Sequence, residues 1–195
     1  MTRFAALAFA LATVAGLGQA QASANLDMYE TLIRPFVQGS AAAPIAASPR
    51  IPREVVAYAG PEAPGTVVVS TSERRLYFVL EGGRAIRYGI GVGRPGFEWS
   101  GVQRVSRMAE WPAWTPPPQM LKRRPDLPRY MEGGEDNPLG ARAMYLGSTL
   151  YRIHGSNEPH TIGEAVSSGC IRMLNEDVVD LYRRVKVGTK VVVLR

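Results

Sequence analysis

The stretch YRIHGSNEPHTIGEAVSSGCIRM, residues 151–173, carries the features from which the rest of the chain can be interpreted. Its first residues are aromatic and β-branched, which predicts a strand that ends at His154. Its last residues include Cys170, the one cysteine of the chain. Glycine stands directly after the histidine and directly before the cysteine, so tight turns can bring the two together. The stretch therefore offers an imidazole and a thiol from two strand and loop ends.

A thiol beside an imidazole is a candidate nucleophile with its base. A free cysteine thiol has a pKa of about 8.5, so only about 3% is thiolate at neutral pH. We expect His154 to raise that fraction by accepting the proton of Cys170. Gly169 lets the chain turn sharply and present backbone N–H groups to a developing oxyanion. The elements of acyl transfer are then all available.

The residues alone leave other interpretations of this stretch open. A lone cysteine can be a buried inert thiol, half of an intermolecular disulfide or a metal ligand. A metal site would use His154, His160 and Cys170, but their spacing matches no known zinc pattern. Arg172, two residues after the thiol, suits bidentate binding of a substrate carboxylate, although an ordinary surface ion pair is the alternative.

The first residues have the pattern of a secretory signal peptide. Arg3 precedes an uncharged run from Phe4 to Gly18, and small residues suited to cleavage follow it. The run is rich in Ala and Gly and is shorter than the roughly 20 apolar residues of a membrane span. We therefore expect residues 1–24 to be removed on export. Export makes an unpaired cysteine unusual, because oxidising compartments favour paired ones.

Composition and charge limit the class of protein and its partners. Hydrophobic residues make up 46% of the chain and charged residues 21%, which is ordinary for a domain with a buried core. The length of 195 residues leaves room for one domain after leader and linker. The formal charge of +6 favours an anionic partner such as cell wall, membrane surface or nucleic acid. Export makes nucleic acid the least favoured.

Residues 25–64 have the composition of a tether, and a β-rich domain is expected over residues 65–194. The tether is rich in Ala, Pro and Ser and holds one short helix candidate, Leu26 to Arg34. Alternating glycines at 89, 91 and 93 predict a bulge or a close backbone approach. β-branched and aromatic runs predict strands at residues 66–70, 75–80, 85–92, 143–146, 150–154 and 190–194.

Two further segments flank these strands. Residues 99–137 hold three tryptophans and many prolines, so we expect a long loop or lid without regular structure. After Cys170, we expect Asn175 to cap a helix. The apolar positions of that helix recur at helical spacing, at Val178, Val179, Leu181, Tyr182 and Val185.

Together these motifs resemble the L,D-transpeptidase catalytic domain, also called the YkuD domain. The resemblance rests on residues 153–163 and 167–173, followed by Asn175 and Asp177. It extends from about Gly65 to Leu194 and includes residues 111–117 and 137–140. It implies a mainly β, β-sandwich-like domain with a short helix after the cysteine.

The resemblance also implies an activity, a peptidoglycan L,D-transpeptidase. Such an enzyme cleaves the bond between the third stem residue, usually meso-diaminopimelate, and the terminal D-alanine, and holds the stem as an acyl-enzyme. An amine acceptor then resolves it: diaminopimelate gives a cross-link, whereas an amine of an envelope protein anchors that protein. This places the chain in the periplasm, associated with the cell wall, without metal or organic cofactor. A hydrolytic variant, acting as L,D-carboxypeptidase or detaching proteins, and a non-catalytic wall-binding module are the alternatives.

The resemblance assigns roles to individual residues. Cys170 is the nucleophile, and His154 is the general base and later the general acid. Gly169 and Cys170 supply oxyanion N–H groups, with Ser168 and Gly155 in support. A backbone carbonyl, as in relatives, is expected to orient His154.

The expected substrate-binding residues surround this centre. Relatives commonly carry an aromatic residue at the position of His160, which is either a plain replacement on the loop wall or a second titrating group. Some relatives also have His or Lys where Ser168 stands. Trp111 and Trp114 are expected in a lid over the stem peptide, with ordinary packing as the alternative. The set is Arg172, Asn157, Trp111, Trp114 and His160.

Overall fold

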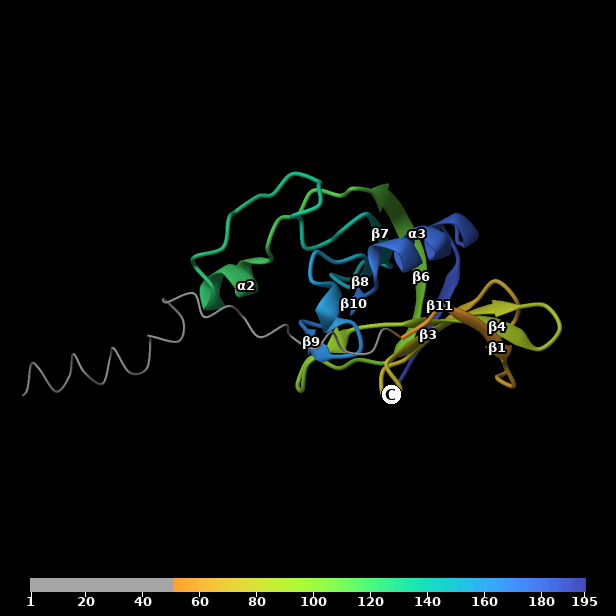
Figure 1. Cartoon of the computed structure of the whole chain (residues 1–195). Helices are drawn as coiled ribbons and strands as arrows, with labels where there is room; N and C mark the ends of the chain where they lie inside the picture. The colour runs from red at the N-terminus through yellow and green to blue at the C-terminus, as the bar shows by residue number, and fades with distance from the viewer. Residues whose placement is uncertain (1–50) are drawn as a thin grey trace, which may run out of the picture. The chain divides into compact units, whose positions relative to one another are not determined.

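A nine-stranded sheet forms the frame of the computed structural model, which describes residues 51–195 (Figure 1). Most neighbouring strands in it are antiparallel, but β2 and β11 are parallel, as are β8 and β10. In spatial order the strands are β1 (Glu54–Ala57), β4 (Arg84–Gly89), β3 (Arg75–Leu80), β2 (Val67–Ser70), β11 (Lys190–Leu194), β6 (Gly101–Glu110), β7 (Arg142–Leu146), β8 (Arg152–His154) and β10 (Ile171–Arg172).

Shorter elements complete the domain. A separate parallel pair is formed by β5 (Val92–Gly93) and β9 (Ala165–Ser167). The helices are α2 (Pro118–Arg123), the 3₁₀ helix η1 (Pro159–Thr161) and α3 (Asn175–Arg184). Within residues 51–195, none of them has the length and apolarity needed to cross a bilayer.

The core lies where α3 packs against the sheet. Val178, Leu181 and Val185 recur at helical spacing, so they share one face of the helix. This face joins a buried cluster that includes Met144 of β7 and Ile153 of β8. α3 contacts both of these strands, as Figure 1 also shows. The expected mainly β fold with a short helix after Cys170 is confirmed.

Several sequence predictions of single elements are also confirmed. Strands occupy the expected positions at β2, β3, β7, β8 and β11. The predicted strand over residues 85–92 is interrupted after Gly89. There Gly91 approaches the backbone so closely that a Cβ would lie 2.9 Å from the carbonyl oxygen of Thr161. The close approach expected from the alternating glycines is therefore present.

Three predictions of local structure are wrong. Residues 101–110 are not part of a loop but form β6, which pairs with both β11 and β7. Most side chains of β6 are exposed, so its sequence lacks an apolar run, and its neighbours supply the hydrogen bonds that define it. The tether does not extend to residue 64, because β1 pairs with β4. Asn175 is the first residue of α3 and makes no cap; Leu174 occupies that position.

The expected signal peptide, most of the expected tether and the helix candidate from Leu26 to Arg34 lie outside the described residues.

Leu181→Ala tests whether α3 anchors the sheet. Leu181 is fully buried in the core cluster. Truncation removes buried methyl groups and leaves a cavity, so the free energy of unfolding should fall by about 2–5 kcal/mol. Arg183→Ala, on the exposed face of the same helix, is the control and should change it by less than about 0.5 kcal/mol. Urea unfolding followed by circular dichroism measures both, and equal effects would contradict this packing.

Candidate active site

The pairing of β8 with β10 brings His154 and Cys170 together. The two strands are parallel, with Ile153 opposite Ile171 and His154 opposite Arg172. Both isoleucines are buried in the core cluster. Side chains alternate along a strand, so His154 and Arg172 point to the opposite face. Cys170 directly precedes Ile171 and so lies at the start of β10, next to Arg152 and two residues along the pair from His154.

The His154 ring is buried and held by a backbone carbonyl. The residue is only 4% exposed, and its Nδ1 lies 2.6 Å from the carbonyl oxygen of Gly155. A carbonyl can only accept, so Nδ1 carries a proton and Nε2 is the basic atom of the neutral ring. The carbonyl of Leu139 also lies near the ring. The carbonyls of Gly155 and Leu139 therefore orient the His154 ring.

Burial keeps His154 neutral. Desolvation lowers the pKa of His154 to about 3, and the positive charges of Arg172 and Arg152 act in the same direction. The hydrogen bonds to the Gly155 and Leu139 carbonyls favour the cation but do not outweigh burial. At neutral pH the ring is therefore an unprotonated base.

The thiol of Cys170 is disfavoured as an anion. Burial raises its pKa above the ordinary value, against the opposing effects of the Arg152 charge, the Arg152 backbone N–H and Arg172. Its Sγ lies 3.8 Å from the carbonyl oxygen of Leu150, a long contact for a weak S–H donor. The expected increase in thiolate is therefore not found in the resting site, because desolvation dominates. The resting pair is a neutral thiol and a neutral imidazole.

The turn before the thiol requires glycine. Gly169 has a φ of +102°, and a Cβ there would lie 2.6 Å from Cε1 of Tyr151. Trp99 stacks on the Tyr151 ring, with centroids 4.5 Å apart, and its Nε1 donates to the Gly169 carbonyl at 2.8 Å. Trp99 and Tyr151 were not singled out from the sequence, since nothing in their local pattern points to this loop.

Ser167 closes the same turn by two hydrogen bonds. Its Oγ accepts from the Gly169 N–H at 3.1 Å and donates to the Cys170 carbonyl at 2.6 Å. The Gly169 N–H is therefore already engaged, which contradicts the expectation that it is a ready oxyanion donor. Across residues 51–195, no hydrogen bond engages the Cys170 N–H. Ser168 accepts a long bond from Arg94 Nη1, at 3.4 Å.

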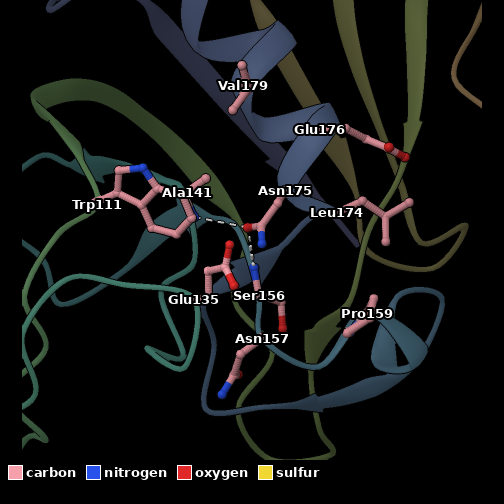
Figure 2. Close-up of a pocket in the computed structure, with 10 residues that line it drawn as sticks. All are labelled: Trp111, Glu135, Ala141, Ser156, Asn157, Pro159, Leu174, Asn175, Glu176 and Val179. Atoms are coloured by element: carbon pink, nitrogen blue, oxygen red, sulfur yellow. Dashed lines mark hydrogen bonds between the residues drawn. The ribbon is translucent and has the colours of Figure 1, made fainter.

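Asn175 holds the segment after His154 in place. Its Oδ1 accepts from the N–H of Ala141 at 3.0 Å and from that of Ser156 at 3.2 Å, as the dashed lines in Figure 2 show. Gly155 has no room for a side chain, because a Cβ would collide with this oxygen. Asn175 thus positions Gly155, whose carbonyl holds the imidazole.

A cavity of about 710 Å³ lies beside this segment (Figure 2). Of the expected substrate-binding residues, Trp111 and Asn157 line it, whereas Trp114 is buried. The Asn157 side chain also donates to the Asp136 carbonyl at 2.9 Å. Neither His154 nor Cys170 borders the cavity. Its lining consists of Trp111, Glu135, Ala141, Ser156, Asn157, Pro159, Leu174, Asn175, Glu176 and Val179.

The other expected binding residues lie on the β10 side. Arg172 Nη1 donates to Glu158 Oε2 at 2.8 Å, so its guanidinium is held by a carboxylate of the chain itself. His160 is exposed on η1. Among the described residues, no set of three or more His, Cys, Asp or Glu side chains is placed to hold a metal.

Arg152 belongs to the site but was missed from the sequence. It is the first residue of β8, and the sequence predicted only a strand at this position. In the structure its charge and backbone N–H act on the Cys170 thiol, and its charge acts on His154. Only the register of β8 with its neighbours reveals this position.

Comparison with known proteins gives one consistent family. The family model described as the L,D-transpeptidase catalytic domain, YkuD, matches residues 64–193. The chain is 40% identical over 137 residues to the probable L,D-transpeptidase ErfK/SrfK of Escherichia coli K12, and 38% identical over 134 residues to the probable L,D-transpeptidase YbiS. These matches cover 66% and 64% of this chain but only 43% of each relative.

Solved structures share the fold. An L,D-transpeptidase from Mycobacterium smegmatis matches with a TM-score of 0.54 and 16% identity, over 67% of this chain and 58% of that one. A Brucella melitensis structure, named a probable carnitine operon oxidoreductase, matches with a TM-score of 0.51 and 46% identity, over 75% of this chain and 96% of that one. Its name differs in activity from the family that the other matches share.

The reactivity of Cys170 tests the electrostatics of the resting site. Because burial raises the thiol pKa, alkylation by iodoacetamide should have its midpoint above about 8.5, the ordinary value. Every alkylation event reports on Cys170, the only cysteine. Rates measured from about pH 5 to 10 by intact mass decide this. A midpoint below about 7 would instead indicate a thiolate–imidazolium pair.

His154 should make stability depend on pH. Its pKa is about 3 in the folded chain and 6.5 in a model peptide, so between these values the unfolded state binds more protons. Relative to His154→Gln, the parent should lose up to about 1.4 kcal/mol of unfolding free energy per pH unit on acidification through this window. Urea unfolding at several pH values measures the difference, and parallel curves would refute it.

Proposed function

Because this chain belongs to the L,D-transpeptidase catalytic domain family, we propose that it transfers peptidoglycan stem peptides through an acyl-enzyme on Cys170. The observation that supports this most directly is the shared face of β8 and β10. β8 carries a neutral, carbonyl-bound imidazole, and the thiol of Cys170 directly precedes the paired strand β10. The chain spans less than half the length of the curated relatives it matches, so activity, substrate and partners are all part of the proposal.

Acylation begins with proton transfer from Cys170 Sγ to Nε2 of His154. The sulfur forms a bond to the carbonyl carbon between the third stem residue and the terminal D-alanine. The negative charge that develops on the carbonyl oxygen is stabilised by the Cys170 N–H, which has no partner among residues 51–195. Collapse breaks the C–N bond, and His154 returns the proton to the leaving amine. A thioester and free D-alanine result.

The second half-reaction uses the same base. The amine of an acceptor loses a proton to His154, attacks the thioester carbon and displaces the Cys170 sulfur. His154 then returns the proton to the sulfur. The neutral resting pair suits this cycle, because His154 must be unprotonated at the start of each half-reaction. With diaminopimelate as acceptor the product is a cross-link; with an envelope protein it is an anchored protein.

Substrate contacts are proposed where expected residues border open space. Trp111 and Asn157 line the cavity beside the segment that follows His154 and can contact a peptide there. Arg172 can bind a substrate carboxylate only by exchanging Glu158 for it. We place the enzyme in the periplasm at the cell wall, which the export signal and the net positive charge support.

Incubation with wall fragments that carry tetrapeptide stems tests the proposal. The parent should gain the mass of a tripeptide acyl group on Cys170 and should produce cross-linked dimers. His154→Gln should slow turnover roughly 100- to 10,000-fold through loss of the general base, and Cys170→Ala should abolish it. Arg183→Ala, exposed on α3, should match the parent.

Mass spectrometry of the products also separates the alternatives. Released tripeptide without dimers would favour the hydrolytic variant. A Cys170→Ala chain that turned over donor as fast as the parent would overturn the acyl-enzyme.

A further inference from the structure

A row of side chains crosses the sheet and ends at the thiol. Arg107 of β6 lies opposite Tyr145 of β7, and Tyr145 lies opposite Arg152 of β8. The next residue of β8, Ile153, pairs with the residue after Cys170. Cys170 therefore continues the row beyond Arg152, on the face that points away from the core. Four residues distant in sequence form one line.

Two cations share the aromatic ring in the middle of this row. The Arg107 Cζ lies 3.6 Å from the centroid of the Tyr145 ring, and the Arg152 Cζ lies 5.4 Å from the same centroid. The electron-rich face of an aromatic ring attracts a guanidinium, and the ring orients both side chains. The arrangement gathers two positive charges within one row of the sheet.

No carboxylate of the described chain balances these two charges. In residues 51–195, neither Arg107 nor Arg152 has an ion pair, whereas Arg172 pairs with Glu158 at 2.8 Å and Arg142 with Glu110 at 3.1 Å. The Arg152 Nε is buried without a hydrogen-bond partner, which is uncommon for a buried polar atom. Two neighbouring like charges raise each other's energy, and a bound anion relieves this.

We propose that Arg152 and Arg107 bind a carboxylate of the acyl donor beside Cys170 and so select donors that are anionic near the scissile bond. The planar guanidinium matches a carboxylate by two parallel hydrogen bonds. The sequence favoured Arg172 for this task, but Glu158 holds its guanidinium. The inference rests on the proposed function, since it names a group of that donor.

Two carboxylates of the tetrapeptide stem fit this chemistry. One is the terminal carboxylate of D-alanine, and the other is on the diaminopimelate side chain. Three donors distinguish them: the free stem, a stem amidated at the terminus and a stem amidated on the side chain. The donor that the parent uses poorly identifies the carboxylate that the row binds.

Acylation kinetics of the full chain test the assignment. Arg152→Gln should lower kcat/KM for the free stem about tenfold or more, mainly through KM. The kcat/KM for the amidated stem that the parent uses poorly should change little. The preference for the free stem should therefore fall toward one. Arg107→Gln should act in the same direction, and Arg152→Lys should retain part of the preference. Arg104→Gln is the matched control, because Arg104 is on β6 but donates to the Gly188 carbonyl outside the row.

The ratio between donors isolates recognition from reactivity. Loss of the Arg152 charge also removes an effect that lowers the Cys170 pKa, but that change slows all donors equally. An equal loss for every donor, or a parent without preference, would overturn the inference.

Binding separates this inference from the proposed function. In a Cys170→Ala background, calorimetry measures stem binding without chemistry. Arg152→Gln should weaken binding of the free stem about tenfold and leave the amidated stem unchanged. If the parent forms no acyl-enzyme while the Cys170→Ala variants show this binding pattern, the proposed transferase activity is refuted and the carboxylate site is supported. A Cys170→Ala chain that binds free and amidated stems equally would refute the site.

Discussion

The register between β8 and β10 is the constraint on which the site depends. Ile153 and Ile171 face each other across this parallel pair and are both buried in the core. A slip of β10 by one residue would turn Ile171 out of the core and its polar neighbours in, so burial of the core fixes the register. The positions of His154 and Cys170 on the other face follow from it. Packing on one side of two short strands thus sets the chemical geometry on the other.

Low polarity around the site determines its resting state. Desolvation lowers the pKa of His154 and raises that of Cys170, so the proton stays on sulfur until a substrate arrives. The nearby arginines oppose the effect at the thiol and reinforce it at the imidazole. A thiol that is neutral at rest resists oxidation better than a thiolate, which protects the single cysteine of the chain.

Local signals were sufficient for part of the fold and site, and non-local contacts account for the remainder. Runs of β-branched residues predict the buried strands β2, β3 and β11. The glycines next to His154 and Cys170 stand at positions where a Cβ would collide with neighbouring atoms. β6 has no such run, because most of its side chains are exposed and its neighbours define it. Arg152, Ser167 and Trp99 join the site only through pairing and turn contacts. The sequence predicted that Asn175 caps the helix, yet its side chain accepts hydrogen bonds from two backbone N–H groups that are far away in sequence.

The central claim is that His154 is a neutral base in the resting site, with its proton on Nδ1. Nitrogen NMR of histidine-labelled protein reports charge and tautomer directly, and His160→Gln assigns the two signals, since the chain has two histidines. At about pH 6, the account predicts that His154 shows one protonated nitrogen, Nδ1, and one unprotonated nitrogen, Nε2, with little change on acidification to about pH 5. Two protonated nitrogens on His154 at neutral pH would contradict it.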